Sequence, residues 1–477
     1  MKDMDQAAVI LWFRRDLRLA DHPALAAAVA QGRPVIPVFV HDETVEALGA
    51  AAKWRLGEGV AAFARALEAA GSRLVLRRGR ALDVLRALLA ETGAGAVHWT
   101  RGYDRDAVVR DSEVKASLRA EGIEARSFPG AVLFEPWTVA TGQGKPYSVY
   151  TPFWRTVRDR DPGRPEPAPA RLRPPEAWPA TEVLRDWAMG AAMSRGAAVV
   201  GRFASVGEAA ARGRLDAFLG EKLARYAEDR DIPAREATSG LSEHLAWGEI
   251  SARTVWHAAM AARDAGARGA EKFLSELGWR EFAWHLIYHA PEMDRRNWRT
   301  DWDGFAWRGD SDEAERWRRG MTGEPFVDAA MREMFVTGRM HNRARMVAAS
   351  YLTKHLLTDW RVGLRWFAEC LTDWDPAANA MGWQWVAGSG PDAAPYFRVF
   401  NPATQAERFD AGGAYRRAYI AEGQADPPAT ALAFFDAAPR RWGLSPGQDY
   451  PRPMISLAEG RRRALDAYAQ RDAASAK

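Results

Sequence analysis

The sequence predicts an α/β domain with a doubly wound parallel sheet, followed by a large all-helical domain. Over the first 130 residues, short apolar runs alternate with amphipathic stretches, which is typical of βαβ units. Beyond about residue 215, apolar residues recur at helical spacing and β-branched runs almost vanish. A length of 477 residues also favours more than one domain.

The elements of the α/β domain can be placed from these runs. The expected strands are Val9–Phe13, Val35–Val40, Leu74–Leu76, Ala96–Trp99 and Ala125–Phe128. The amphipathic stretches between them predict helices at Lys53–Ala70, Ala81–Glu91 and Ala107–Ala120. Asp21, two residues before Pro23, is expected to cap an additional helix after the first strand.

A proline-rich segment separates the two predicted domains. Seven prolines occur between residues 162 and 179 without a hydrophobic period, which predicts an extended connector. We therefore expect an α/β domain at 1–130, a connector at 131–214 and a helical domain at 215–477.

Several protein classes are excluded or disfavoured. A single cysteine, Cys370, excludes an internal disulfide framework and a thiolate zinc cluster, and it fits a reducing cytoplasm. No metal site is expected, and no apolar run is long enough for a membrane helix. The first strand is not followed by Gly-x-Gly-x-x-Gly, which disfavours a dinucleotide-dependent dehydrogenase.

Tryptophan and arginine are concentrated in the helical half. The chain has 21 Trp against 19 Phe and 11 Tyr, and thirteen of the tryptophans lie between Trp247 and Trp385. The segment from Arg339 to Phe367 has six basic residues and one acidic residue, although the net charge of the chain is only +4. Core filling accounts for most of the indoles, but cations interleaved with flat rings favour nucleic-acid binding.

Six motifs then identify a family. They are Trp12-Phe-Arg-Arg-Asp-Leu-Arg-Leu-x-Asp-His-Pro-Ala-Leu, Thr238-Ser-Gly-Leu-Ser-Glu-His-Leu-x-Trp-Gly-Glu-Ile-Ser, Glu276-Leu-Gly-Trp-Arg-Glu-Phe, Gly338-Arg-Met-His-Asn-Arg-Ala-Arg-Met, Asp373-Trp-Asp-Pro-Ala-Ala-Asn-Ala-Met-Gly-Trp-Gln-Trp and Asp392-Ala-Ala-Pro-Tyr-Phe-Arg-Val-Phe-Asn-Pro. Together they resemble the motifs of DNA photolyases and cryptochromes over the whole chain. The resemblance is nearest to class I cyclobutane pyrimidine dimer photolyases.

The resemblance implies a U-shaped FAD in the helical domain. The implied flavin-binding residues are Tyr226, Thr238, Ser239, Gly240, Leu241, Ser242, Arg345, Asp373, Asp375 and Asn379. Within this set the residues from Tyr226 to Ser242 would bind the phosphates, and Arg345 would pair with Asp373. Asn379 would lie at flavin N5, where an amide supports the reduced ring. Two positions depart from the family, which usually has proline at Glu243 and often arginine at Gly240.

The resemblance also implies UV-damaged DNA as the partner. The implied substrate-binding residues are Glu276, Trp279, Arg280, Asn342, Arg343, Met346, Trp385 and Gln405. Trp279 and Trp385 would form aromatic walls around the flipped dimer, and Glu276 would hydrogen-bond a pyrimidine edge.

Two further sets of residues indicate which lesion is repaired and how the flavin is reduced. Asn342 and Met346 are four residues apart and share a face, and neither can transfer a proton as the histidine pair of (6-4) photolyases does. We therefore expect light-driven splitting of cyclobutane dimers. Trp383, Trp360 and Trp307 match the family's electron relay between flavin and surface.

The resemblance leaves other points open. A second, light-harvesting chromophore stays open between methenyltetrahydrofolate, 8-hydroxy-deazaflavin, FMN and no antenna, because Ala107 stands where folate-binding members have an acidic residue. A cryptochrome-type blue-light receptor and a (6-4) photolyase are the alternative functions. We expect a cytoplasmic monomer without a membrane segment.

Overall fold

The computed structural model describes residues 7–392 and 397–475. In its N-terminal half, five parallel strands form one sheet. They are β1 (Val9–Phe13), β2 (Val35–His41), β3 (Val75–Arg78), β4 (Ala96–Thr100) and β5 (Glu124–Phe128). The strand order is β3-β2-β1-β4-β5, and the register pairs Val9 of β1 with Val35 of β2 and with Ala96 of β4. The predicted fold class is confirmed, and no strand end differs from the prediction by more than two residues.

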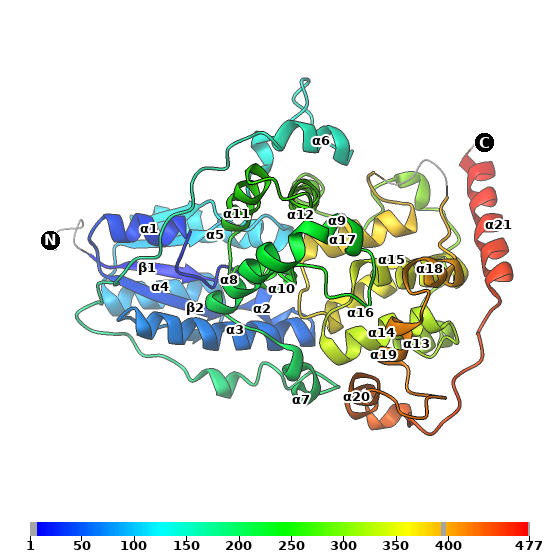
Figure 1. The fold of residues 1–477 in the computed structure, drawn as a ribbon. Helices are drawn as coiled ribbons and strands as arrows, with labels where there is room; N and C mark the ends of the chain where they lie inside the picture. Colours follow the sequence, from blue (N-terminus) through cyan, green and yellow to red (C-terminus); the bar gives the residue numbers. More distant parts are fainter. Residues whose placement is uncertain (1–6, 393–396, 476–477) are drawn as a thin grey trace.

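Helices cover both faces of this sheet (Figure 1). They are α1 (Pro23–Ala30), α2 (Glu43–Glu46), α3 (Ala50–Ala69), α4 (Ala81–Thr92) and α5 (Arg105–Ala120). Apolar side chains of α1 and α3 pack on one face with Leu11 and Phe13, and those of α4 and α5 pack on the other with Ile10 and Trp12. Because both faces are covered, every residue of β1 and β2 is buried, which explains their uninterrupted apolar runs.

The predicted cap of the first helix is wrong. The ring of His22 accepts the Leu25 N–H at 3.1 Å, so His22 caps α1. Asp21 instead has a positive φ of 50° and receives hydrogen bonds from Arg253 and Ser251 in the helical half. A tertiary ion pair therefore outweighs the local capping preference of this aspartate.

Apart from one isolated bridge between Arg308 and Thr358, the regular secondary structure in the rest of the described chain is helical. Its helices are α6 (Tyr150–Val157), α7 (Ala197–Val200), α8 (Glu208–Ala217), α9 (Tyr226–Asp229), α10 (Ser242–Ala246), α11 (Ala252–Asp264), α12 (Ala270–His289), α13 (Asp312–Arg318), α14 (Pro325–Thr337), α15 (Asn342–Ser350), α16 (Trp360–Cys370), α17 (Pro376–Ala387), α18 (Pro402–Phe409), α19 (Ala414–Tyr419), α20 (Ala429–Ala437) and α21 (Leu457–Ser475). α21 lies at the end of the molecule away from the sheet (Figure 1). No helix in the described ranges is long and apolar enough to cross a membrane.

The segment between the two halves follows the α/β domain closely. Residues 162–179 contain no helix or strand, and Leu172 is fully buried while its N–H donates to Ala70. The division at 1–130, 131–214 and 215–477 stays a prediction. Residues 393–396, within the last of the six motifs, lie outside the described residues.

The first motif fastens the sheet to the helical half. After β1, the Arg15 guanidinium donates to the carbonyls of Ala246 and Trp374 at 3.0 and 2.9 Å. Arg18 is buried and donates to Gly248 at 3.0 Å. Gly248 has a φ of +66°, and a Cβ there would lie 2.1 Å from the Arg15 carbonyl oxygen, so only glycine permits this approach.

A buried ion pair crosses the same junction. Arg55 of α3 donates to both carboxylate oxygens of Glu249 at 2.9 and 2.8 Å, and both side chains are fully buried. His244 lies 2.5 Å from the same carboxylate. Burial alone would raise the pKa of Glu249, but the hydrogen bonds from His244 and Arg55 outweigh it and hold the pKa below its ordinary value.

Removing one partner of this pair leaves a buried charge without compensation. We expect Arg55→Ala to lower the free energy of unfolding by about 3–5 kcal/mol. Denaturant titration followed by circular dichroism measures the change.

Arg65→Ala is the matched control, because Arg65 is exposed on the same helix. Equal free energies of unfolding for Arg55→Ala and Arg65→Ala would contradict a role of the ion pair in stability.

Candidate active site

A cavity of about 760 Å³ opens between α15, α17 and the segment that joins α16 to α17. Seven of the predicted residues line it: Asn342, Arg345, Met346, Asp373, Asp375, Asn379 and Trp383. Residues three and four apart on one helix share a face, so α15 presents the first three together, and α17 presents Asn379 and Trp383 together.

The predicted pairing of Arg345 with Asp373 is confirmed. Nη2 of Arg345 lies 2.9 and 2.7 Å from the two carboxylate oxygens, and Nε donates to the Met340 carbonyl at 2.8 Å. Only 4% of the Asp373 side chain is exposed, so the guanidinium compensates an otherwise buried charge. The pair holds the α16–α17 segment against the start of α15.

Two further polar residues of the wall, Asp375 and Asn379, contact nearby backbone. Oδ1 of Asp375 accepts the Ala378 N–H at 2.8 Å and caps α17. The Asn379 amide donates to the Leu364 carbonyl of α16 at 3.1 Å, which orients its side chain. The remaining lining is largely apolar, with Phe367 and Trp383 among its members.

The predicted aromatic walls come from α12 and α17, which pack together. Trp279 of α12 stacks on Tyr150, with ring centroids 3.7 Å apart and planes within 11°. Trp385 of α17 donates its indole N–H to the Asp392 carbonyl at 3.1 Å, and the carboxylate of Asp392 accepts the Tyr150 N–H at 3.2 Å. Sequence reasoning missed Tyr150 and Asp392, because both act through tertiary contacts that have no sequence spacing.

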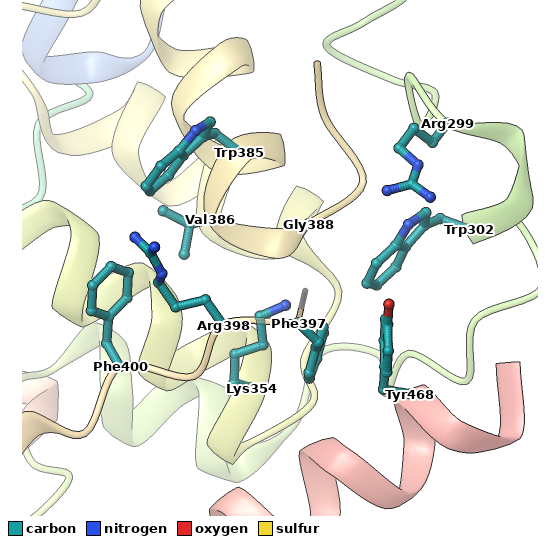
Figure 2. Close-up of a pocket in the computed structure, with 10 residues that line it drawn as sticks. All are labelled: Arg299, Trp302, Lys354, Trp385, Val386, Gly388, Phe397, Arg398, Phe400 and Tyr468. Atoms are coloured by element: carbon teal, nitrogen blue, oxygen red, sulfur yellow. The ribbon is translucent and has the colours of Figure 1, made fainter. Parts of the chain in front are cut away.

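Trp385 also borders a second hollow (Figure 2). Figure 2 shows Lys354, Phe397 and Tyr468 on its far side, with Arg398 reaching between them and Trp385. The Lys354 ammonium is buried, lies 3.5 Å from the Phe397 centroid and donates to the Ala387 carbonyl. Desolvation lowers the Lys354 pKa well below its usual value.

The other predicted substrate residues lie outside the cavity between α15 and α17. Glu276 forms ion pairs with Arg230 and, at 2.9 Å, with Lys272, one turn earlier on α12. The pairing with Arg230 has no sequence signal and was not predicted. Arg343 pairs with Asp231 at 2.9 Å and lies over Phe409.

Two further members of the predicted set have different surroundings. Arg280 donates to Glu281 and to the Ala131 carbonyl, at 2.8 and 2.9 Å, so it faces the domain junction. The Oε1 atom of Gln405 is buried without a hydrogen-bond partner in the described part of the chain.

The three tryptophans expected to form the electron relay are connected through α16. Trp383 packs directly on Gly363, where a Cβ would lie 2.0 Å from its ring, and Trp360 is one turn earlier on the same helix. The residue after Trp307 bonds to Leu357 and to Asp359, immediately before Trp360. Exposure rises outward, since Trp383 and Trp360 are buried and Trp307 is partly exposed.

The predicted phosphate-binding segment lies apart from this cavity. Tyr226 is buried against Phe218 and Phe273, while Thr238 and Ser242 are exposed. Leu241 is buried and anchors the segment, and its N–H donates to Ser239 at 3.4 Å. Glu243 is turned inward, where its carboxylate accepts from Thr372 and lies 3.6 Å from Arg55.

A larger cavity of about 1190 Å³ lies between the two halves. It includes Arg14, Asp42 and Asp104, which follow β1, β2 and β4, at the sheet edge where α/β proteins bind ligands. Trp374 and Asn379 line both this cavity and the smaller one. No group of three or more His, Cys, Asp or Glu within 7–392 and 397–475 is arranged to hold a metal ion.

The parallel α/β sheet, the helical half and its polar-edged cavity define a two-domain protein that binds a large planar cofactor. Residues 9–174 match the family model of DNA photolyase, and residues 273–470 match that of the FAD binding domain of DNA photolyase. A deoxyribodipyrimidine photo-lyase of Agrobacterium fabrum is 45% identical over 468 residues, which cover 97% of this chain and 98% of that protein. The chain belongs to the DNA photolyase family, and its cofactor is FAD.

Solved structures agree with this assignment. A class III photolyase from Agrobacterium tumefaciens has a TM-score of 0.89 and 44% identity, with 98% of each chain covered. A cryptochrome from Synechocystis has a TM-score of 0.84 and 27% identity, with 98% of this chain and 100% of that chain covered.

The relay geometry gives a prediction for light-driven reduction of the bound flavin. We expect Trp307→Phe to slow photoreduction, because the benzene ring is harder to oxidise than indole and the outermost relay position is lost. Absorbance at the oxidised flavin band under blue light measures the rate.

Trp442→Phe serves as the control, since Trp442 packs on Phe335 in the same helical core. Repair by pre-reduced Trp307→Phe protein should stay intact. Equal loss of photoreduction and repair would contradict a role confined to the relay.

Proposed function

We propose that the protein is a deoxyribodipyrimidine photo-lyase that splits cyclobutane pyrimidine dimers in UV-damaged DNA with blue light and reduced FAD. The observation that carries this function is 45% identity to a protein of that name over almost the whole chain. The cavity between α15 and α17 supports it, because seven residues proposed from the family motifs line it.

The residues of the smaller cavity fit a flavin ring. Its walls are apolar around Phe367 and Trp383, and its polar groups gather at Arg345, Asp373 and Asn379. This distribution suits a flat aromatic ring system with a polar edge. We propose that these residues hold the ring, while Tyr226 and residues 238–242 hold the phosphates. When bound, reduced FAD supplies the light-excited electron that opens the cyclobutane ring and receives it back.

The protein's own residues then have distinct tasks. Arg345 holds Asp373 in place at the cavity wall, so the wall needs no rearrangement on binding. Asn379, held by α16, presents a neutral amide that neither gives nor takes a proton. Trp279, supported from behind by Tyr150, offers a rigid aromatic face for an extruded base.

The lesion class follows from α15. Asn342 and Met346 lie side by side, with the amide nitrogen 3.9 Å from the thioether sulfur. Neither group exchanges a proton near neutral pH, so this face supplies no acid–base pair. Splitting a cyclobutane ring by electron transfer needs none, which favours the cyclobutane dimer over the (6-4) photoproduct.

The class I assignment stays a prediction, and the similarity to a class III photolyase favours class III for this chain. We propose that an antenna chromophore occupies the larger cavity between the two halves, with its identity open between methenyltetrahydrofolate, 8-hydroxy-deazaflavin and FMN. A monomeric state and a cytoplasmic location stay predictions.

One assay tests the function. Protein with reduced FAD is mixed with two oligonucleotides, one carrying a cyclobutane thymine dimer and one a (6-4) photoproduct, in blue light and in darkness. We expect restoration of the cyclobutane substrate alone, and only in light. Restoration of neither lesion would contradict the proposed repair function and favour a cryptochrome-type blue-light receptor. Restoration of the (6-4) lesion would contradict the proposed role of α15.

The ion-paired Glu276 gives a sharper prediction. We expect Glu276→Ala to reduce the amount of dimer split per absorbed photon, because a hydrogen bond to the pyrimidine edge is lost. The flavin absorbance of the purified variant should be unchanged.

Lys272→Ala is the matched control, because it removes the exposed partner of Glu276 and leaves the carboxylate. Loss of bound flavin from Glu276→Ala would show that the residue belongs to the cofactor site instead.

A further inference from the structure

We propose that Arg214 of α8 binds the diphosphate of FAD directly. The inference rests on the proposed placement of the FAD phosphates at residues 238–242. Arg214 belongs to none of the six motifs, and it lies 24 positions before the residue that opens this segment, Thr238.

The position of Arg214 is defined by Gly240. Gly240 is the central residue of the segment from Thr238 to Ser242 and has a φ of +63°. A Cβ built on Gly240 would lie 2.5 Å from Nη1 of Arg214 and 3.7 Å from its Cζ. The guanidinium therefore lies directly over the backbone of the phosphate segment, in space that any side chain at position 240 would take.

The charge of Arg214 is not neutralised by the protein. Over the described ranges, no carboxylate lies within ion-pair distance of its guanidinium. Burial lowers the Arg214 pKa, and the charges of Arg339 and Arg55 lower it further. Glu243 and Glu236 only partly offset them. By contrast, Arg212 on the same helix pairs with Glu208 at 3.1 Å.

Two carboxylates act on Arg214 from a distance, the exposed Glu236 and the buried Glu243, and Glu243 is already engaged elsewhere. One oxygen of Glu243 accepts from Thr372, and the other lies 3.6 Å from Nε of Arg55. Arg339 lies 4.0 Å from the first oxygen and donates to the Phe203 carbonyl. Arg214 and Arg339 thus leave positive charge beside the segment, and a diphosphate is the anion of the cofactor that matches it.

The test measures FAD affinity and not activity. Apoprotein is titrated with FAD, and quenching of flavin fluorescence gives the dissociation constant for wild type, Arg214→Ala, Arg214→Lys and Arg212→Ala. We expect Arg214→Ala to bind FAD at least about tenfold more weakly, as removal of a charge-assisted hydrogen bond predicts. Arg214→Lys should retain part of the affinity, and Arg212→Ala should match wild type.

Riboflavin separates a phosphate contact from general damage to the site. It lacks phosphate, so its affinity should be the same in wild type and Arg214→Ala. Equal weakening of riboflavin and FAD would overturn the proposal, and so would FAD affinity in Arg214→Ala equal to that in Arg212→Ala. If the wild-type protein itself binds no FAD, the proposed function fails. This result differs from the two outcomes that overturn the role of Arg214, because in those the wild-type protein binds FAD.

A second variant keeps the proposal testable if Arg214→Ala does not fold. Gly240→Ala places a methyl group where the guanidinium lies and should weaken FAD binding by displacing it. In the Arg214→Ala background the same substitution should have a smaller effect, because the guanidinium is gone and only the backbone strain of alanine at a φ of +63° remains. Full additivity of the two changes would contradict the placement of Arg214 over Gly240.

Discussion

The buried pairing of Arg55 with Glu249 determines how the two halves of the molecule meet. Glu249 follows α10, which adjoins the proposed phosphate-binding segment at 238–242, and Arg55 lies on a helix that covers the sheet. Because both charges are fully desolvated, each requires the other, and small relative shifts of the domains are costly. Glu243 extends the connection from Arg55 to Thr372, the residue before Asp373. One polar network therefore positions the phosphate segment and the flavin cavity relative to the sheet.

Different elements surround the smaller cavity on its different sides. Arg345 and Asp373 fix the wall of the smaller cavity, and Asn379 lies where that cavity and the larger interdomain cavity adjoin. Light collected between the domains would thus be close to the flavin that uses it. On the other side, Gly363 allows Trp383 to touch α16, which leads towards the surface.

The sequence predicted the parts of this arrangement that depend on local pattern. Buried parallel strands produce uninterrupted apolar runs, so the α/β fold and most strand positions could be predicted from periodicity. Arg345 and Asp373 were predicted through family motifs, and the structure brings them together. Asp21 was wrongly placed, because its ion pair with Arg253 spans more than 200 residues and outweighs helix capping. Tyr150 and Arg230 were missed because their contacts exist only in the folded chain.

A crystal structure of the protein loaded with FAD tests the central claim most directly. We predict that the isoalloxazine ring lies in the cavity between α15 and α17, with its polar edge towards Arg345, Asp373 and Asn379, and that the diphosphate lies at residues 238–242. Density for the ring in the larger interdomain cavity, with the smaller one closed by side chains, would contradict it.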